Sequence, residues 1–455
     1  MTFTLFFSPS IFPPMKTTAL PGFRDFYPDD LALRSHIFAT WRSVAGRYGF
    51  EEYDGPPLES LDLYTGKSGD EIVGQLYNFT DKGDRDVALR PEMTPTLARM
   101  VAARANGLRK PIRWFSIPQL FRYERQQRGR LREHFQLNCD LIGEAGPLGD
   151  AEIIALAIDV MRAFGLTAQD VRVRLSDRRV LAAVLAARGV PASALGQAYQ
   201  FIDKVERLRR DEIDRFTSEA ASVIGPATVY DLEEVSRIKG WSKLEAELDR
   251  APETQAAAVP LRATYAALEA MGLADFIDLD LAIVRGLAYY TGTVFELFDA
   301  GRTLRAICGG GRYDNLLSSL GGVDLPALGF GMGDVVLAEL LKERGLGPTA
   351  AAGLDVFVAA VTADDLPRVL ALAHELRDAG LRVEYALSVV PLRKQLDLAA
   401  ARRARYAVVV GPDEWARGEV VLRDFEEKEK AKAQRAIARA AVVAEIAGLA
   451  RRGAA

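Results

Sequence analysis

The chain has 455 residues, of which 49% are hydrophobic and 26% charged, and its formal net charge is −4. This is the composition of a globular chain of about two to four domains, and the charge excludes a global positive field, so any RNA contact must come from local basic patches. The two cysteines and three histidines are too scattered along the chain for a structural zinc site. No apolar run is long enough to predict a membrane span. The scarcity of cysteine fits a reducing cytoplasm.

Residues 1–15 are predicted to be a disordered extension. They are apolar, contain three prolines and have no Lys or Arg before the apolar run. This is a poor signal peptide, and Met15 would serve equally well as the start of the chain.

Residues 16–170 alternate between helix-like and strand-like segments. Apolar spacing predicts helices over Leu31–Tyr48 and Asp150–Phe164, each followed by glycine. Two β-rich runs flank an arginine-rich loop, and they predict a long antiparallel hairpin of Trp114–Tyr123 and His134–Ile142.

Residues 171–276 are dominated by helix formers, above all alanine, and are predicted to be a helical insertion. Strand patterns return over 277–344, where we expect three strands, Asp278–Arg285, Thr291–Phe298 and Arg302–Cys308. Glycines 309–311 are expected to punctuate the chain. A second glycine-rich run then leads into a helix within Leu328–Arg344.

A linker is predicted over 345–353, where small residues surround Pro348. Beyond it, residues 354–455 alternate strands with helices and predict a small α/β domain with a largely parallel sheet. Its expected strands are Asp355–Val361, Arg382–Tyr385 and Tyr406–Val410, with helices over Leu366–Ala379 and Leu392–Arg403. The charged, alanine-rich run Glu426–Arg439 is predicted to be a solvated helix.

The loop of the predicted hairpin is the first candidate for chemistry. Five arginines fall within Arg122–Arg132, and arginine suits both a bidentate grip on phosphate and stacking on a base. A solvated loop that happens to be basic is an equal alternative. In the strand that follows, Gln136, Asn138 and Asp140 alternate with apolar residues and share one face, which could form the floor of a polar pocket or simply meet water.

The run Phe121–Gly143 resembles motif 2 of class II aminoacyl-tRNA synthetases, in the form found in histidyl-tRNA synthetases. The resemblance implies that Arg122 binds the α-phosphate and the amino-acid carboxylate, and that Arg125 holds the rest of ATP. It also implies that Gln136 and Asp140 face the substrate histidine. The family often has glutamate in place of Asp140.

The run Val284–Gly292, with sequence VRGLAYYTG, resembles the motif specific to that family. A neutral imidazole offers one donor and one acceptor on opposite sides of the ring, so Asp140 can accept from one nitrogen while the Tyr290 hydroxyl satisfies the other. The resemblance adds Tyr289 to the histidine site and places Arg285 near the reacting carboxylate and α-phosphate. The family usually has aspartate where Ala288 stands.

Two further segments resemble the family. In Leu89–Thr94, the resemblance implies that Glu92 and Thr94 bind the amino group of histidine. The run Cys308–Asp314 is similar to the glycine-rich turn under the histidine site, and we place Arg312 among the ATP-binding residues. Motif 3 departs from the family pattern, because its usual arginine is replaced by Val336 in a Gly-Asp form similar to the plant organellar branch. Arg125 or Arg312 is therefore expected to hold the terminal phosphates.

As a whole, the resemblance implies an α+β catalytic domain with a mostly antiparallel sheet, the helical insertion, and a C-terminal α/β anticodon-binding domain. It implies a histidyl-tRNA synthetase that uses ATP with Mg²⁺, binds L-histidine and histidine tRNA, acts in the cytoplasm as a homodimer, and has no structural metal. Basic residues of the last domain are candidates for tRNA contact: Arg393, Lys394, Arg402 and Arg403. The main alternative is the non-catalytic regulatory subunit of ATP phosphoribosyltransferase, a paralogue that generally lacks the anticodon domain.

Overall fold

The computed structural model describes residues 18–65, 74–125, 127–205, 212–214, 218, 221, 226–284, 290–427, 429 and 433–452. The chain forms two compact units, Met1–Thr349 and Ala350–Ala455. The boundary lies inside the segment predicted as a linker. Each unit has hydrophobic cores of its own.

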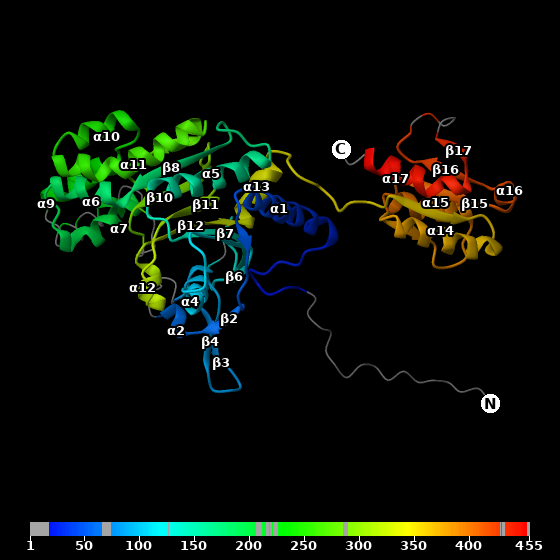
Figure 1. Cartoon of the computed structure of the whole chain (residues 1–455), viewed down its shortest axis with the longest axis horizontal. Helices are drawn as coiled ribbons and strands as arrows, with labels where there is room; N and C mark the ends of the chain where they lie inside the picture. Colours follow the sequence, from blue (N-terminus) through cyan, green and yellow to red (C-terminus); the bar gives the residue numbers. More distant parts are fainter. Residues whose placement is uncertain are drawn as a thin grey trace. The chain divides into compact units, whose positions relative to one another are not determined.

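The first unit is built on a mixed sheet, in the strand order β1-β5-β7-β12-β11-β10-β8-β9, with β6 also paired to β7 (Figure 1). Only the outer pairs β1–β5 and β8–β9 are parallel, and the other described pairs are antiparallel. The prediction of a mostly antiparallel sheet is therefore confirmed. The strands are β1 Glu51–Glu52, β5 Ile112–Ser116, β6 Gln119–Phe121, β7 Glu133–Ile142, β8 Val171–Asp177, β9 Ile277–Leu279, β10 Thr293–Asp299, β11 Cys308–Arg312 and β12 Ala327–Gly333.

Three helices pack on one face of this sheet: α1 (Pro28–Arg47), α5 (Pro147–Ala163) and α13 (Asp334–Glu343) (Figure 1). Leu137, Cys139 and Leu141 of β7 point into the core that these helices cover. Because side chains alternate along a strand, Gln136, Asn138 and Asp140 lie on the opposite face. That face carries the candidate site.

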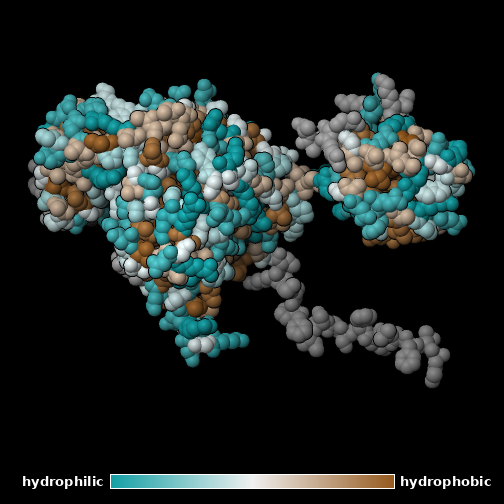
Figure 2. Space-filling model, in the orientation of Figure 1, coloured by the Kyte–Doolittle hydropathy of each residue, from teal (hydrophilic) through white to brown (hydrophobic). Residues whose placement is uncertain are grey.

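The opposite face has a smaller core at one end, where α4 (Thr94–Arg104) and α12 (Leu316–Gly321) pack together. Beside it lies a three-stranded antiparallel sheet in the order β2-β4-β3, with the bounds Leu58–Ser60, Asp86–Leu89 and Tyr77–Thr80, and the short helix α2 (Asp62–Thr65). The hairpin of β3 and β4 projects from the unit, and Figure 2 shows hydrophilic residues at its tip.

The helical insertion starts later than predicted. Residues 171–177 form strand β8 of the main sheet, with Val171, Val173 and Leu175 buried in the core. The helical part comprises α6 Arg178–Ala187, η1 Ala192–Ala194, α7 Leu195–Val205, α9 Pro226–Ser236, α10 Trp241–Leu248, α11 Pro252–Ala270 and η2 Ala274–Phe276. Helix α11 packs against α5 and α6, and so joins the insertion to the sheet.

A second prediction was wrong around the glycine run. The expected strand Arg302–Cys308 is mostly a turn, and Cys308–Arg312 forms β11. Glycine is required inside the sheet at position 310 because the neighbouring strand leaves no room for a side chain. A Cβ on Gly310 would lie 2.3 Å from the carbonyl oxygen of Gly329.

The second unit is an α/β domain with the strand order β14-β13-β15-β16-β17. Strands β14, β13 and β15 are parallel, and β16 and β17 continue the sheet in antiparallel fashion. The elements are β13 Val356–Ala360, η3 Ala363–Asp365, α14 Leu366–Asp378, β14 Val383–Tyr385, α15 Leu392–Ala401, β15 Tyr406–Val410, α16 Pro412–Ala416, β16 Glu419–Asp424, β17 Gln434–Ala438, η4 Arg439–Ala441 and α17 Val442–Arg452.

The predicted helix Glu426–Arg439 is contradicted where the structure describes it. Residues 434–438 form strand β17, which pairs with β16. Ile437 fills a place in the core, and this burial outweighs the helix propensity of the alanines. Among the described residues, no helix is long and apolar enough to cross a membrane.

Candidate active site

Glycines make room for polar side chains on the open face of the sheet. Gly329 of β12 lies opposite Asp140 of β7, and a Cβ on Gly329 would lie 2.4 Å from Asp140 Oδ1. A Cβ on Gly331 would lie 2.6 Å from the amide of Gln136. Any larger residue at these positions would displace a side chain that the sequence places in the histidine site.

Asp140 is buried, with only 3% of its surface exposed. Its Oδ1 accepts a hydrogen bond from the hydroxyl of Tyr313, which is also buried. Burial raises the pKa of Asp140 to about 7, and the hydrogen bond from Tyr313 opposes that rise. A carboxylate in this environment is a strong acceptor for an imidazole N–H.

Tyr290 lies next to this pair. Its ring centroid is 6.5 Å from that of Tyr313 in an edge arrangement, and a Cβ on Gly311 would lie 3.0 Å from its Cδ1. Arg178, the first residue of α6, donates to the carbonyl oxygen of Tyr290 at 3.0 Å and to that of Val284 at 3.1 Å. The structure thus brings the ring of Tyr290 beside the Tyr313–Asp140 pair.

Two residues assigned from the sequence, Arg285 and Tyr289, lie outside the described residues. Their roles stay predictions. The described residues on either side, Val284 and Tyr290, are both held by Arg178.

Arg122 and the segment around Glu92 meet beside the glycine-lined face. The Nε of Arg122 donates to the Pro91 carbonyl oxygen at 2.9 Å. Glu92, the next residue, is 5% exposed, and Thr94 is the first residue of α4. The guanidinium of Arg122 therefore lies against the backbone of the segment that carries Glu92 and Thr94.

Arginines of the loop between β6 and β7 lie close to His134 of β7. Burial, together with the nearby cations Arg122, Arg24 and Arg130, lowers the pKa of His134 to about 3. His134 is therefore neutral at physiological pH. Arg125 is exposed on this loop, whereas Arg130 is paired with Glu124.

Arg312 has a different environment from the one expected. It is 1% exposed, and its Nη2 lies 2.8 Å from Asp150 of α5. Its other nitrogens donate to Asp150, to Asp314 and to the carbonyl oxygen of Glu144. Since neighbours on a strand point to opposite faces, Arg312 faces the helices while Gly311 faces Tyr290. This geometry argues against a role in ATP binding and indicates a structural one.

The variant motif 3 has a structural explanation at Asp334. This buried carboxylate accepts from Nη1 of Arg24 at 2.9 Å and from the backbone N–H of Phe135 at 2.9 Å. It therefore fastens the start of α13 to β7. Val336, where the family has arginine, is 7% exposed and lies in the main core.

Sequence reasoning missed Tyr313, Arg178 and Arg24. Tyr313 lies within the glycine-rich segment that was singled out, and its place two residues after Gly311 was the one signal that could have found it. Arg178 was hidden because residues 171–178 were assigned to the insertion. The partners of Arg24 lie 109 and 310 residues away, so no local pattern reveals them.

In the second unit, Arg393 and Lys394 are exposed on the first turn of α15. Arg402 is paired with Glu384, where its Nε lies 2.8 Å from Oε2. Arg403 is exposed and has a φ of 55°, which places it at the turn after the helix.

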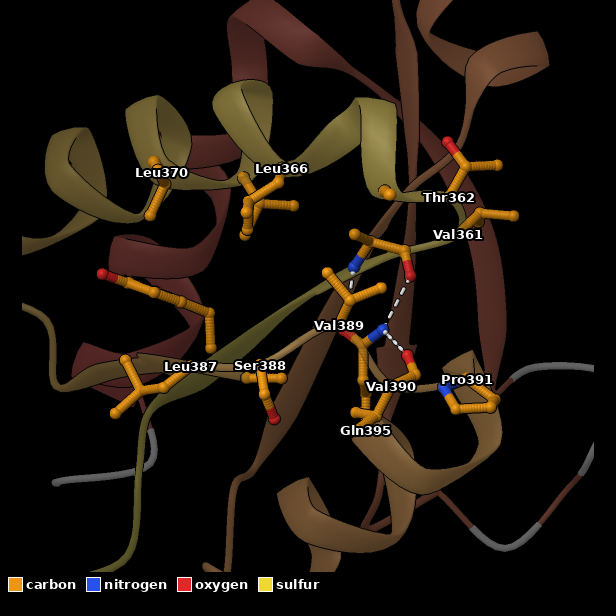
Figure 3. A pocket seen from close by; sticks show the side chains of 15 residues that line it. Val361, Thr362, Leu366, Leu370, Leu387, Ser388, Val389, Val390, Pro391 and Gln395 are labelled. Atoms are coloured by element: carbon orange, nitrogen blue, oxygen red, sulfur yellow. Dashed lines mark hydrogen bonds between the residues drawn. The ribbon is translucent and has the colours of Figure 1, made fainter. Parts of the chain in front are cut away.

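Next to Arg393 and Lys394 is a cavity of about 630 Å³ at the carboxyl ends of β13 and β14. Figure 3 shows Leu387 and Val389 on its loop side, facing Leu366 and Leu370 of α14. Gln395 anchors the loop, because its side chain bonds both backbone groups of Ala360 and the carbonyl oxygen of Val390.

Comparison with known proteins agrees with this geometry. A family model described as histidyl-tRNA synthetase matches residues 22–334, and one described as anticodon binding domain matches residues 355–448. The chain belongs to the histidyl-tRNA synthetase family. The histidine–tRNA ligase of Opitutus terrae is 49% identical over 414 residues, which are 90% of this chain and 93% of the relative.

Other members of the histidyl-tRNA synthetase family are also similar. The chloroplastic/mitochondrial histidine–tRNA ligase of Arabidopsis thaliana is 42% identical, over 88% of this chain and 82% of the relative. The crystal structure of the histidyl-tRNA synthetase from Nostoc sp. PCC 7120 superposes with a TM-score of 0.80 at 25% identity, covering 95% of this chain and 99% of that one. The predicted family and fold class are confirmed.

Proposed function

We propose that the chain acts as a histidine–tRNA ligase, which activates L-histidine with ATP and transfers it to the 3′ end of histidine tRNA. The observation that carries the proposal is the buried Asp140, paired with Tyr313 beside Tyr290, on a face that adjoins the arginine loop. The anticodon-binding domain model over residues 355–448 supports the transfer to tRNA.

The first step needs no general base. The histidine carboxylate, already an anion, attacks the α-phosphorus of ATP; a carboxyl O–P bond forms, the bond to the bridging oxygen breaks, and pyrophosphate leaves. The difficulty is repulsion between anions and charge growing on the phosphate, so cations placed in advance should dominate catalysis. In this proposal Arg122 and Arg285 hold the carboxylate and the α-phosphate, and Arg125 contacts the rest of ATP.

Recognition of histidine follows from the hydrogen-bonding groups of the pocket. Asp140 accepts from one imidazole nitrogen, and the Tyr290 hydroxyl satisfies the other. Gln136 extends over Gly331 toward the same space, with Tyr289 assigned there by the family motif. Glu92 and Thr94 bind the α-amino group, since a carboxylate is the natural partner of an ammonium.

Magnesium enters the proposal as part of the ATP complex. Among the described residues, no group of three or more His, Cys, Asp or Glu side chains is placed to hold a metal ion. Magnesium commonly keeps several waters and binds through substrate phosphates with one or two carboxylates, so it needs no cluster of protein ligands.

For the tRNA, we propose that Arg393, Lys394, Arg402 and Arg403 contact its backbone, Arg402 after giving up its pairing with Glu384. The proposal also includes a homodimer, with the region around Pro56 and Pro57 at the two-fold axis, and action in the cytoplasm, where the two buried free cysteines would stay reduced.

The regulatory-subunit alternative is not favoured. A protein described as an ATP phosphoribosyltransferase regulatory subunit/histidyl-tRNA synthetase from Bacillus halodurans C superposes with a TM-score of 0.71 at 21% identity, a likeness of fold alone. That paralogue is expected to lack the anticodon domain, whereas residues 355–448 of this chain match the anticodon-binding domain model.

The test measures ATP–pyrophosphate exchange and tRNA charging by the purified chain. We expect exchange that depends on histidine and not on glycine, threonine or proline, together with charging of histidine tRNA. Absence of histidine-dependent exchange from a folded preparation would refute the proposal and favour the regulatory alternative.

A further inference from the structure

Alternate glycines of β12 lie on the face of the sheet that carries Asp140 and Gln136. A Cβ on Gly329 or Gly331 would meet Asp140 or Gln136, whereas a Cβ on Gly333 would meet nothing within 4 Å. This face of β12 thus runs from Gly329, opposite Asp140, to the start of α13, where the arginine loop also lies. In a displacement at phosphorus, the leaving group departs roughly in line with the attacking oxygen. Pyrophosphate should therefore leave away from Asp140, toward this end.

At the start of α13, Val336 has no charge to offer to a phosphate. The arginine loop packs against the Val336 side chain. A Cβ on Gly129 of the loop would lie 3.2 Å from Val336 Cγ2. Arg128 further fastens the loop to α13, with its Nη2 2.6 Å from Glu343 and its Nε 3.3 Å from Glu339.

Arg305 reaches the same place from another part of the sheet. It lies in the turn between β10 and β11, and the Gly333 N–H donates to the Ile307 carbonyl oxygen at 3.1 Å, which places that turn beside the start of α13. The Arg305 Cδ is 3.7 Å from a Cβ built on Gly129, and its Nη2 donates to Gln127 Oε1 at 3.2 Å.

The charges around the loop distinguish Arg305 from its neighbours. Arg128 and Arg130 are already paired with carboxylates of the chain. The side chain of Arg305 donates to a neutral amide, and it makes no ion pair with any carboxylate in the described parts of the chain. An exposed guanidinium held by an amide keeps its charge for an anionic ligand.

We propose that Arg305 binds the terminal phosphates of ATP, and that it supplies the positive charge that Val336 does not. This inference rests on the proposed function. It replaces Arg312, whose guanidinium is enclosed by Asp150 and Asp314.

The test compares Arg305→Ala, Arg305→Lys and Gln127→Ala in the full chain, with Arg344→Ala as the matched control. Arg344 is also an exposed arginine of the first unit, paired with Asp170 at 3.4 Å. Steady-state exchange gives the KM for ATP and for histidine, and inhibition of charging by added pyrophosphate gives its inhibition constant. Circular dichroism checks that each variant is folded.

For Arg305→Ala, we expect the KM for ATP and the inhibition constant of pyrophosphate to rise together, by about 10- to 100-fold, as for loss of a charged hydrogen bond. The KM for histidine should not change, Arg305→Lys should recover part of the loss, and Gln127→Ala should stay near wild type. An unchanged KM for ATP would overturn the inference. An equal loss in Gln127→Ala would overturn it too, because Arg305 would then act only as a tether for the loop. If the wild-type chain shows no histidine-dependent exchange, the proposed function fails rather than this inference.

Discussion

The Asp140 carboxyl, which we propose to recognise histidine, also destabilises the fold at neutral pH. Its pKa of about 7 in the folded chain lies above the ordinary aspartate value of 3.8, because burial penalises the charged form. The folded state therefore binds a proton more tightly than the unfolded state. That contribution to stability is present below pH 3.8 and is lost as the pH rises through about 7.

We therefore expect Asp140→Asn to weaken function while it strengthens the fold. The variant should raise the KM for histidine about tenfold or more, since the amide can present its N–H where an acceptor is needed. Its melting temperature should exceed that of wild type at about pH 8, and the difference should disappear near pH 4. Melting curves across this pH range and exchange kinetics check both points. An unchanged KM would remove Asp140 from the pocket.

Arg285→Ala tests the cation assigned by the family motif. Removing one donor placed to stabilise a transition state typically costs a factor of ~10²–10³ in rate. We expect a loss of adenylation of at least this size, with an unchanged circular dichroism spectrum, in a single-turnover assay. Near-normal exchange would contradict the role of Arg285.

At the level of elements, strand β12 offers a matched pair of glycines. In Gly329→Ala, the new Cβ would lie 2.4 Å from Asp140 Oδ1 and 2.6 Å from the Cys139 carbonyl oxygen, whereas in Gly333→Ala it would meet nothing within 4 Å. We expect Gly329→Ala to raise the KM for histidine and to lower the free energy of unfolding by about 1–3 kcal/mol, the usual cost of overpacking. Gly333→Ala should change both little. Equal behaviour of the two variants in urea titrations and exchange assays would contradict the glycine-lined pocket.

The polar face of β7 was predictable and the glycine strand was not. Alternation of Gln136, Asn138 and Asp140 with apolar residues specifies a half-buried strand by itself. The run Cys308–Arg312 has no such signal, because glycine disfavours strands unless close neighbours demand it. The close neighbours of Gly310 are Gly329 and Phe330, and the sequence alone does not show that these residues lie beside it. Strand β8 was missed for the opposite reason: an alanine-rich helix follows it directly and dominates the composition of the segment.

Arg312 marks the limit of motif-based assignment within an element. Its sequence neighbours are glycines beside the histidine pocket, and this suggested a ligand contact. The side chain points to the other face and pairs with Asp150, which lies 162 residues away in the chain. The spacing of the sequence can place Arg312 on a strand. It does not show which face of the sheet offers a partner, because that partner lies on a helix that is distant in the sequence.

At the scale of the whole molecule, the chain consists of two units with separate cores, and the proposed function assigns catalysis to the first unit and tRNA contact to the second. The C-terminal unit was predicted well as far as β15, because its strands and helices are short, locally patterned segments, and Gly380, Pro391 and Gly411 mark the end of α14, the start of α15 and the end of β15. Both strands after β15 were missed: no strand was predicted over β16, and β17 is exposed except at Ile437. The chemistry assigned to the first unit and the tRNA contact assigned to the second should therefore be separable by mutation.

The double variant Arg393→Ala, Lys394→Ala tests this separation. Both side chains are exposed on the first turn of α15. If they contact phosphates, the variant should raise the KM for tRNA in charging. It should also make charging less sensitive to salt, with the slope falling by roughly 0.7–0.9 for each phosphate that is no longer neutralised. Histidine-dependent exchange, which needs no tRNA, should stay at the wild-type rate.

Arg417→Ala is the control for that measurement, because Arg417 is an exposed arginine of the same unit whose charge is balanced by Glu414 and Glu419. An arginine that is already paired with carboxylates releases few counterions on binding. The salt dependence of charging by Arg417→Ala should therefore match that of the wild-type chain. If the double variant and Arg417→Ala give the same KM and the same slope, the basic turn of α15 does not bind tRNA. If the double variant also slows exchange, the two units are coupled in the adenylation step, and the assignment of one task to each unit is wrong.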